Sequence, residues 1–128
     1  RSYWFSKAAE QGNVKSQVYL GNAYNNGNGV RKDEKLAFHW YMQAAQKDDP
    51  EALYNVGLYY QYGKNVVKNY YKALNWFRKS AEQDFVQSKY AIEDLIKKGS
   101  NGGMKNKSRL VLLIFVLAVA LVLLYLNL

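Results

Sequence analysis

The chain has 128 residues, about one domain, and 49% of them are hydrophobic whereas 22% are charged, which excludes a polar disordered chain. The formal net charge is +8, but residues 1–96 hold 13 basic and 10 acidic side chains, a balance that does not indicate nucleic acid as a partner. Since there is no cysteine and only one histidine, His39, the composition excludes disulfides, cysteine nucleophiles and zinc sites built on thiolates or several histidines.

A repeat of 36 residues is the dominant pattern from the start of the chain. Three similar phrases, WFSKAAEQG, WYMQAAQKD and WFRKSAEQD, recur at that spacing, and many other columns keep the same phase. Repeats of this length are typical of solenoids, in which each unit buries its apolar faces against the next unit. The columns that we interpret as structural are Trp4, Trp40, Trp76, Gly21, Gly57, Gly27, Gly63, Tyr24, Tyr60, Ala45 and Ala81.

Each unit predicts two α-helices joined by a short turn. Apolar residues at helical spacing form one stripe on the first helix, at residues 52–60, and another on the second helix, at residues 36–45. We expect Trp40 and Trp76 to be buried between these helices. Gly21 and Gly57 lie inside first helices, where glycine costs about 1 kcal/mol, so we expect a neighbouring helix to approach closely at both positions.

The residues at the ends of these helices agree with the expected boundaries. Asp33 and Asn69, 36 residues apart, are suitable N-caps for the second helices. Pro50 suits the first position of a helix, where its missing N–H costs nothing. Gly27 and Gly63 follow the first helices and predict left-handed C-terminal residues with positive φ.

These columns resemble the Sel-1-like repeat (SLR) family, a solenoid family related to tetratricopeptide repeats. The motif is carried by residues 16–45, which include the turn G-N-G-V, and again by residues 52–81. The resemblance covers residues 1–99 and implies an all-α, right-handed superhelix of αα-hairpins with a scaffold or adaptor role. About two full repeats are present, with partial units at both ends. In the last unit Glu93 replaces the helix glycine, and we expect no second helix there.

No constellation of residues for catalysis, metal binding or cofactor binding is apparent, so we predict that the chain is not an enzyme and uses no metal and no cofactor. His39 lacks partner ligands, and the acidic pairs Asp48-Asp49 and Glu93-Asp94 are interpreted as helix ends or solvated faces. The glycine-rich turns lack the lysine and Ser/Thr of a phosphate loop. We expect neither a nucleic acid nor a small-molecule substrate.

Tyrosines are concentrated in the second full unit, where they suggest a partner-binding surface. Tyr24 and Tyr60 hold a repeat column and are interpreted as core, but other tyrosines do not fit a core stripe. Exposed tyrosine provides rigid, amphipathic contact area suited to protein recognition, although ordinary surface tyrosines are an equal alternative. The candidate partner-binding residues are Tyr59, Tyr62, Lys64, Lys68 and Tyr70.

The C-terminal part differs in composition from the repeats. Residues 100–109 form a polar, basic linker, and residues 110–128 are almost entirely apolar. The 17 uncharged residues from Leu110 to Leu126 would form a helix about 26 Å long, near the lower limit for crossing a bilayer. We therefore predict one C-terminal transmembrane helix. Its membrane-anchoring residues are Lys105, Lys107 and Arg109 on the linker side and Tyr125 near the far end.

The predicted function is a membrane-anchored adaptor, in which the solenoid binds proteins or peptides and the C-terminal helix contacts membrane lipid. Within the SLR family, this architecture resembles an adaptor in endoplasmic-reticulum-associated degradation, which implies the endoplasmic reticulum membrane and luminal repeats. The positive-inside rule instead favours cytosolic repeats. The alternatives are a bacterial SLR protein in envelope regulation or host interaction, and a surface protein whose tail is a GPI signal beginning near Ser100.

Overall fold

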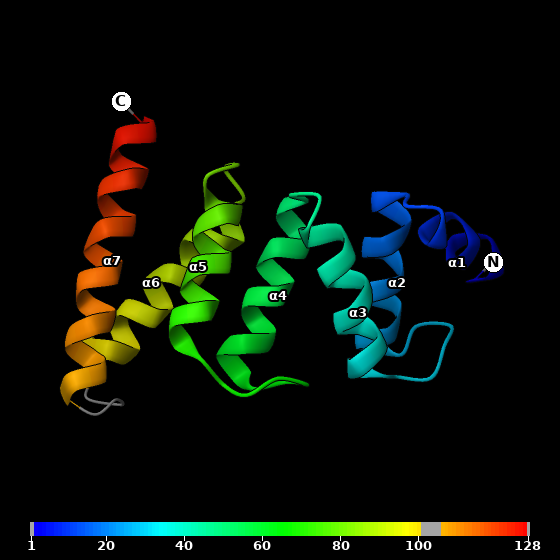
Figure 1. Ribbon diagram of the computed structural model, residues 1–128, viewed down its shortest axis with the longest axis horizontal. Coiled ribbons are helices and arrows are strands. Elements are labelled where there is room, and N and C mark those ends of the chain that lie inside the picture. Colours follow the sequence, from blue (N-terminus) through cyan, green and yellow to red (C-terminus); the bar gives the residue numbers. More distant parts are fainter. Residues whose placement is uncertain (1, 101–105, 128) are drawn as a thin grey trace.

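The computed structural model describes the backbone of residues 2–100 and 106–127, and the side chains of residues 3–98, 111 and 113–127. In these ranges all regular structure is α-helical. The helices are α1 (Ser2–Glu10), α2 (Val14–Asn26), α3 (Glu34–Ala45), α4 (Pro50–Tyr62), α5 (Tyr70–Ala81), α6 (Val86–Ser100) and α7 (Asn106–Asn127). Helices α1 to α6 follow one another along the long axis of the molecule, and α7 stands at the far end beside α5 and α6 (Figure 1).

The helix boundaries confirm the 36-residue period. Helices α2 and α4 both have 13 residues, and α3 and α5 both have 12. Each later helix of a pair begins 36 residues after the earlier one, at residues 14 and 50 and at residues 34 and 70. The hairpins α2–α3 and α4–α5 are therefore equivalent units, and the predicted all-α repeat solenoid is confirmed.

The predicted helix ends are also confirmed. Asp33 Oδ1 accepts a hydrogen bond from the backbone N–H of Leu36 at 3.1 Å, and Asn69 caps the next unit in the same way at 3.0 Å. Gly27 and Gly63 have φ values of 70° and 66° at the C-termini of α2 and α4. Because L-residues with a Cβ avoid this left-handed region, glycine ends the first helix of each unit at a defined residue.

The two glycines inside first helices allow an aromatic ring to approach. The Tyr41 ring of α3 covers Gly21, and the Phe77 ring of α5 covers Gly57 in the same way one unit later. Both rings are buried, and each comes from the second helix of the glycine's own unit. The expected close approach is therefore present, and a side chain makes it rather than a helix backbone.

The tryptophans are less buried than the repeat pattern predicts. Trp40 and Trp76 are half-buried rather than enclosed between helices, and Trp4 is 69% exposed on α1. In α3 and α5 the residue after the tryptophan, Tyr41 or Phe77, lies in the core instead. The reason is steric: this next residue is the one that faces the helix glycine and fills the space above it.

The core consists of two clusters that follow the repeat. The first joins α2, α3 and α4 around Ala37, Tyr41, Ala45, Leu53 and Val56. The second joins α5, α6 and α7 around Ala73, Leu74, Phe77, Ala81 and Leu95. The residues Tyr24 and Tyr60, which share one repeat column, are half-buried and pack against these clusters, and Tyr60 touches both. This column was predicted to lie in the core, and it lies at the edge of the core.

Helix α7 packs against the last unit of the solenoid. Its buried residues Val116 and Val119 belong to the second core cluster, beside α5 and α6 (Figure 1). The last unit therefore receives a second helix, which the sequence pattern did not predict. Among the residues that the structure describes, no helix is long and apolar enough to cross a membrane, so the predicted transmembrane helix gains no support from the fold.

Candidate functional site

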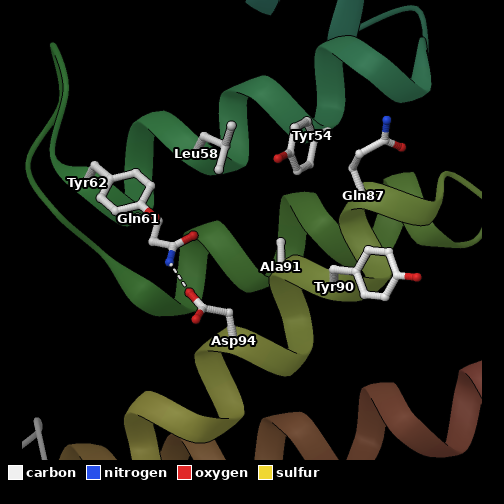
Figure 2. Close-up of a pocket in the computed structure, with 8 residues that line it drawn as sticks. All are labelled: Tyr54, Leu58, Gln61, Tyr62, Gln87, Tyr90, Ala91 and Asp94. Atoms are coloured by element: carbon white, nitrogen blue, oxygen red, sulfur yellow. Dashed lines mark hydrogen bonds between the residues drawn. The ribbon is translucent and has the colours of Figure 1, made fainter.

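Two open recesses lie between the first helices of neighbouring units, and together we call them the first-helix groove. One recess, of about 380 Å³, is lined by Lys15, Val18, Tyr19 and Asn22 of α2 and by Asp49 and Glu51 at the start of α4. The other, of about 300 Å³, is lined by Tyr54, Leu58, Gln61 and Tyr62 of α4 and by Gln87, Tyr90, Ala91 and Asp94 of α6 (Figure 2). Several lining positions are 36 residues apart, such as Val18 and Tyr54, so the two recesses occupy equivalent positions in successive units.

Tyrosines form the two sides of the second recess. The Tyr54 ring is held in place from below, since its centroid lies 5.8 Å from that of Phe77 and 5.5 Å from that of Phe85. Burial raises the pKa of the Tyr54 hydroxyl, and the nearby Tyr62 raises it further. Tyr90 of α6 is 65% exposed beside the recess (Figure 2). A fixed ring next to an exposed ring offers contact area at little cost in side-chain entropy.

The other end of the second recess is polar but electrically balanced. Gln61 Nε2 donates to Asp94 Oδ2 across the recess at 3.2 Å (Figure 2). Lys98 Nζ lies 3.2 Å from the same carboxylate oxygen and 5.3 Å from the centroid of the Tyr62 ring. The carboxylate of Asp94 is thus paired, and this end of the recess presents amide and phenol groups rather than an isolated charge.

Two buried tyrosine hydroxyls connect helices next to the groove. Tyr41 donates to Asn22 Oδ1 at 2.6 Å, and Tyr59 donates to Asn25 Oδ1 at 2.7 Å. Burial raises the pKa of Tyr59 to about 12, with smaller contributions from two nearby carboxylates, and burial also raises the pKa of Tyr41. Both hydroxyls are therefore neutral donors at physiological pH, and their role is to fix α2 against its neighbours.

The structure separates the five residues of the predicted partner-binding surface. Tyr59 is 2% exposed and packs against two aromatic rings of α3, so its placement on the surface is corrected to a place in the core. Tyr62 lines the second recess. Lys64 Nζ lies 5.6 Å from the Tyr59 ring centroid, and Lys68 Nζ lies 4.9 Å from the Tyr70 ring centroid. Lys64, Lys68 and Tyr70 do not line the second recess. A binding role for Lys64, Lys68 and Tyr70 stays a prediction.

Sequence reasoning missed most of the groove. Val18, Tyr54 and Tyr90 share one repeat column but differ in residue type, so the search for matching columns passed over them. The available signal was positional: these residues lie one helical turn or less from the apolar stripe of the first helix. Leu58 and Asp94, another equivalent pair, show the same variation.

The predicted membrane-anchoring residues fall largely outside the described part of the chain. This applies to Lys105 and to the side chains of Lys107 and Arg109. Tyr125 is described, and its ring is exposed near the end of α7. Tyr125 does not line either recess of the groove, and its anchoring role stays a prediction.

The described residues contain no group of three or more His, Cys, Asp or Glu side chains placed to hold a metal ion. The His39 ring is exposed and lies edge-on to its neighbour Trp40, with ring centroids 4.9 Å apart. The described groove offers contact area, hydrogen-bonding groups and, in the first recess, the charged side chains of Lys15, Asp49 and Glu51.

Stacked helical hairpins with a groove repeated at the same period define the class of α-solenoid repeat proteins. Within that class, the family model for the Sel1 repeat matches residues 3–13, 14–49 and 50–85, and the chain belongs to the Sel1 repeat family. Members of this family typically bind other proteins, and the resemblance to SLR proteins is confirmed.

Solved structures of bacterial proteins agree with this assignment. A Sel1 repeat protein from Oxalobacter formigenes is 40% identical, with a TM-score of 0.69 over 72% of this chain and 69% of its own. A protective antigen of uropathogenic Escherichia coli strains, which displays an SLR fold, is 38% identical with a TM-score of 0.72, over 75% of this chain but 21% of its own. Helicobacter pylori cysteine rich protein B is 30% identical, with a TM-score of 0.63 over 68% of this chain and 65% of its own. A comparison with curated protein sequences gives no significant match.

Proposed function

We propose that the chain is a protein-interaction scaffold that binds an extended polypeptide segment of its partner in the first-helix groove. The observation that carries this proposal is the repetition of the recess at the period of the units, between α2 and α4 and again between α4 and α6. A groove that repeats along one direction suits a ligand whose backbone also repeats along its length. Binding rather than catalysis follows from the contact area and hydrogen-bonding groups that line it, and no cofactor is invoked.

The lining residues specify the chemistry of the bound segment. Each recess combines tyrosine with amide groups, as in Tyr90 with Gln87, and the carboxylate of Asp94 already has a cationic partner in Lys98. A strongly charged ligand would therefore find no unpaired counter-charge in the second recess. We propose an extended segment that seats apolar or aromatic side chains in the second recess, whereas the first recess, with Lys15, Asp49 and Glu51, also accepts polar or charged side chains.

The test is selection of binders from a displayed library of random peptides, using the full chain as bait. The selected peptides are expected to be rich in apolar and aromatic residues and to bind with a measurable dissociation constant. Tyr90→Ala should weaken binding by about tenfold or more, since an aromatic anchor at an interface contributes more than 1 kcal/mol. Tyr90 is exposed, so this change leaves the core intact.

The matched control is Tyr3→Ala. Tyr3 is 66% exposed, as Tyr90 is, but lies on α1 away from the second recess. We expect it to leave peptide affinity unchanged. Equal weakening by both substitutions, or selected peptides whose affinity ignores Tyr90, would contradict the groove as the binding site.

Membrane attachment is a separate proposal. Its support is the exposed apolar surface of α7, including Leu117, Leu121 and Tyr125, and the basic linker sequence before it. With the linker on the cytosolic side by the charge rule, added protease should degrade the repeats of the chain expressed in microsomes. Protected repeats would contradict the cytosolic orientation, and recovery of the chain in the soluble fraction would contradict attachment itself.

The relatives support one of the narrower biological roles. The similar solved structures come from bacteria, which supports the alternative of a bacterial SLR protein that contacts host or envelope proteins. The comparisons lend no support to a role in endoplasmic-reticulum-associated degradation. Peptides that bind the groove provide the test, because their sequences can be matched to host or envelope proteins.

A further inference from the structure

The surplus positive charge of the repeats is concentrated at one end of the helices. This end, which we call the turn end, comprises the turns 27–33 and 63–69, the first turns of α3 and α5, and residues 93–98 of α6, along the lower edge of the view in Figure 1. It carries eight basic and four acidic side chains, whereas the rest of residues 3–98 carries six of each. Its basic residues are Arg31, Lys32, Lys35, Lys64, Lys68, Lys72, Lys97 and Lys98. The turn end is therefore the part of the repeats that attracts an anionic partner most strongly.

The hairpin α4–α5 provides much of this charge. No acidic residue occurs between Glu51 and Glu82. Lys64, Lys68 and Lys72 each lie over a tyrosine ring, with the ammonium nitrogen 4.9–5.6 Å from the ring centroid. Among the described residues, none of these three lysines forms an ion pair. Since an aromatic ring orients a cation without neutralising its charge, all three can pair with an anion from outside the chain.

The tip of the turn between α4 and α5 is apolar. Val67 is 88% exposed, the highest exposed fraction of any large hydrophobic residue that the structure describes. It lies between Lys64 and Lys68 in the sequence, and its neighbour Val66 packs against the core. The turn therefore uses one valine for folding, and a second one is left in the solvent. At the equivalent position of the preceding turn the exposed residue is Arg31, so the repeat does not require an apolar residue there.

A bilayer with anionic lipid fits these features better than a nucleic acid or an acidic polypeptide. Phosphate groups of the lipid can pair with the lysines, and the interfacial layer beneath them takes up an apolar side chain. A nucleic acid or an acidic peptide would pair with the lysines but leave Val67 in water. The turns lie along one edge of the solenoid, which suits a flat partner (Figure 1). Residues 99–109, which follow α6 in the sequence, add three basic and no acidic side chains.

We propose that the turn end of the solenoid docks on a bilayer that contains anionic phospholipid, with Lys64, Lys68 and Lys72 among the headgroups and Val67 inserted between them. Two of the predicted partner-binding residues, Lys64 and Lys68, then bind lipid rather than a protein. This docking depends on lipid charge and involves neither the first-helix groove nor the apolar surface of α7. It is therefore distinct from peptide binding and from attachment through α7.

The test compares the partition of the full chain onto two kinds of vesicle, pure phosphatidylcholine and phosphatidylcholine with about one-third phosphatidylserine. We expect the anionic vesicles to bind about thirtyfold or more tightly at low salt, and added salt to remove most of this preference. The preference is the readout, because attachment through the apolar surface of α7 contributes to both kinds of vesicle.

Neutral variants locate the docking surface. Lys64→Gln combined with Lys68→Gln should reduce the preference about tenfold or more, since each lysine near an anionic surface changes the partition about fivefold. The matched control is Lys7→Gln combined with Lys15→Gln, which removes the same charge from exposed lysines at the opposite end of the helices. Far-UV circular dichroism verifies that every variant is folded.

A dye reports the insertion of the tip. The chain contains no cysteine, so Val67→Cys provides a single site for an environment-sensitive fluorophore. Its emission should shift to the blue on anionic vesicles. Val86→Cys, which replaces a valine 52% exposed at the start of α6 and away from the turn end, should show no shift.

Equal partition of the wild type onto both kinds of vesicle would overturn the proposal, and it would leave peptide binding and attachment through α7 standing. Equal losses in the two double variants would also overturn it, because the chain would then respond to net charge without a fixed orientation. A blue shift at Val86→Cys as large as that at Val67→Cys would have the same consequence. Binding of polyglutamate without a preference for anionic vesicles would instead assign the turn end to an acidic polypeptide.

Discussion

Gly57 and Phe77 fit together so closely that a Cβ atom placed on Gly57 would lie 2.5 Å from the aromatic ring. Gly21 and Tyr41 repeat this relationship one unit earlier, also at 2.5 Å. The ring belongs to the second helix of the unit and the glycine to its first, so the pair sets the distance between the two helices of a hairpin. An exposed glycine in a helix would instead be a simple defect of about 1 kcal/mol.

We expect Gly57→Ala to destabilise the chain by about 1–3 kcal/mol, even though alanine is the better helix former. The added methyl group overpacks a site where Phe77 is fully buried, and that cost exceeds the gain in helix propensity. Denaturant unfolding followed by circular dichroism gives the change in free energy. In a chain that already carries Phe77→Leu, the added methyl group of Gly57→Ala no longer meets the ring. Gly57→Ala should therefore cost less stability there than in the wild type. A Gly57→Ala variant more stable than the wild type would show that the ring can move aside freely.

A second repeated feature is the left-handed residue that links one unit to the next. Gly12, Asp48 and Asp84 are 36 residues apart and have φ values of 93°, 63° and 62°. Asp48 makes this turn without glycine, and its carbonyl oxygen accepts a hydrogen bond from Gln83 Nε2 at 2.7 Å. A change of the Asp48 side chain preserves that backbone acceptor, so substitutions here leave the bond from Gln83 in place.

We expect Asp48→Ala to cost about 1 kcal/mol, because alanine in the left-handed region lacks the local polar contacts by which aspartate tolerates it. Asp48→Gly should equal or exceed the wild type in stability, since glycine adopts this φ without penalty. Thermal melts of the three chains give the ranking. Equal melting temperatures for the alanine and glycine variants would show that the turn is not strained at this residue.

The buried pair Ser80 and Ser88 is a local departure from the repeat. Ser88 Oγ donates to Ser80 Oγ at 2.6 Å, and Ser80 Oγ donates to the carbonyl oxygen of Pro50 at 2.7 Å. One unit earlier the equivalent positions are Ala44 and Ala52, which are fully buried. The chain therefore contains both an apolar and a hydrogen-bonded version of the same contact.

We expect Ser80→Ala to cost about 1–3 kcal/mol, because it leaves the buried Ser88 hydroxyl without its acceptor. Ser88→Ala should cost less, about 0.5–1.5 kcal/mol, since Ser80 keeps its bond to Pro50. The double variant should lose less than the sum of the two, because it recreates the alanine pair of the preceding unit. A double-mutant cycle by denaturant unfolding measures this coupling, and strict additivity would contradict the hydrogen-bonded chain.

These contacts show what the sequence could and could not predict. Helix ends were predictable because capping residues act within a few residues of the chain. The Asp33 side chain accepts a hydrogen bond from a backbone N–H in the first turn of α3, and Gly27 adopts the positive φ that ends α2. The identity of the core aromatic was not, because Trp40 and Tyr41 are adjacent and both apolar, and only the position of Gly21 across the hairpin decides between them. That decision is a tertiary contact, which the period alone does not contain.

The same limit applies to α7 and to the groove. A helix that is apolar on all sides gives no indication of which face packs, so the burial of Val116 and Val119 against the last unit could not be read from residues 110–128. The groove lies between first helices of neighbouring units, and its residues vary from unit to unit, as Val18 and Tyr54 do. Conserved spacing revealed the scaffold, whereas the candidate site occupies the variable columns.

The last prediction concerns alkaline pH and the buried hydroxyl of Tyr59. The ordinary pKa of tyrosine is 10, and burial raises the pKa of Tyr59 to about 12 in the folded chain. The unfolded chain therefore releases this proton first, so the stabilisation by the neutral hydroxyl is complete below pH 10 and is lost as pH rises from about 10 to about 12.

Tyr59→Phe removes the proton and the bond to Asn25, which should cost about 1 kcal/mol at neutral pH. The stability advantage of the wild type over this variant should shrink across that window and then reverse. Denaturant unfolding of the wild type and of Tyr59→Phe at stepped pH measures this difference. A constant difference between wild type and Tyr59→Phe from neutral pH to above pH 12 would show that the Tyr59 hydroxyl titrates alike in the folded and unfolded chains.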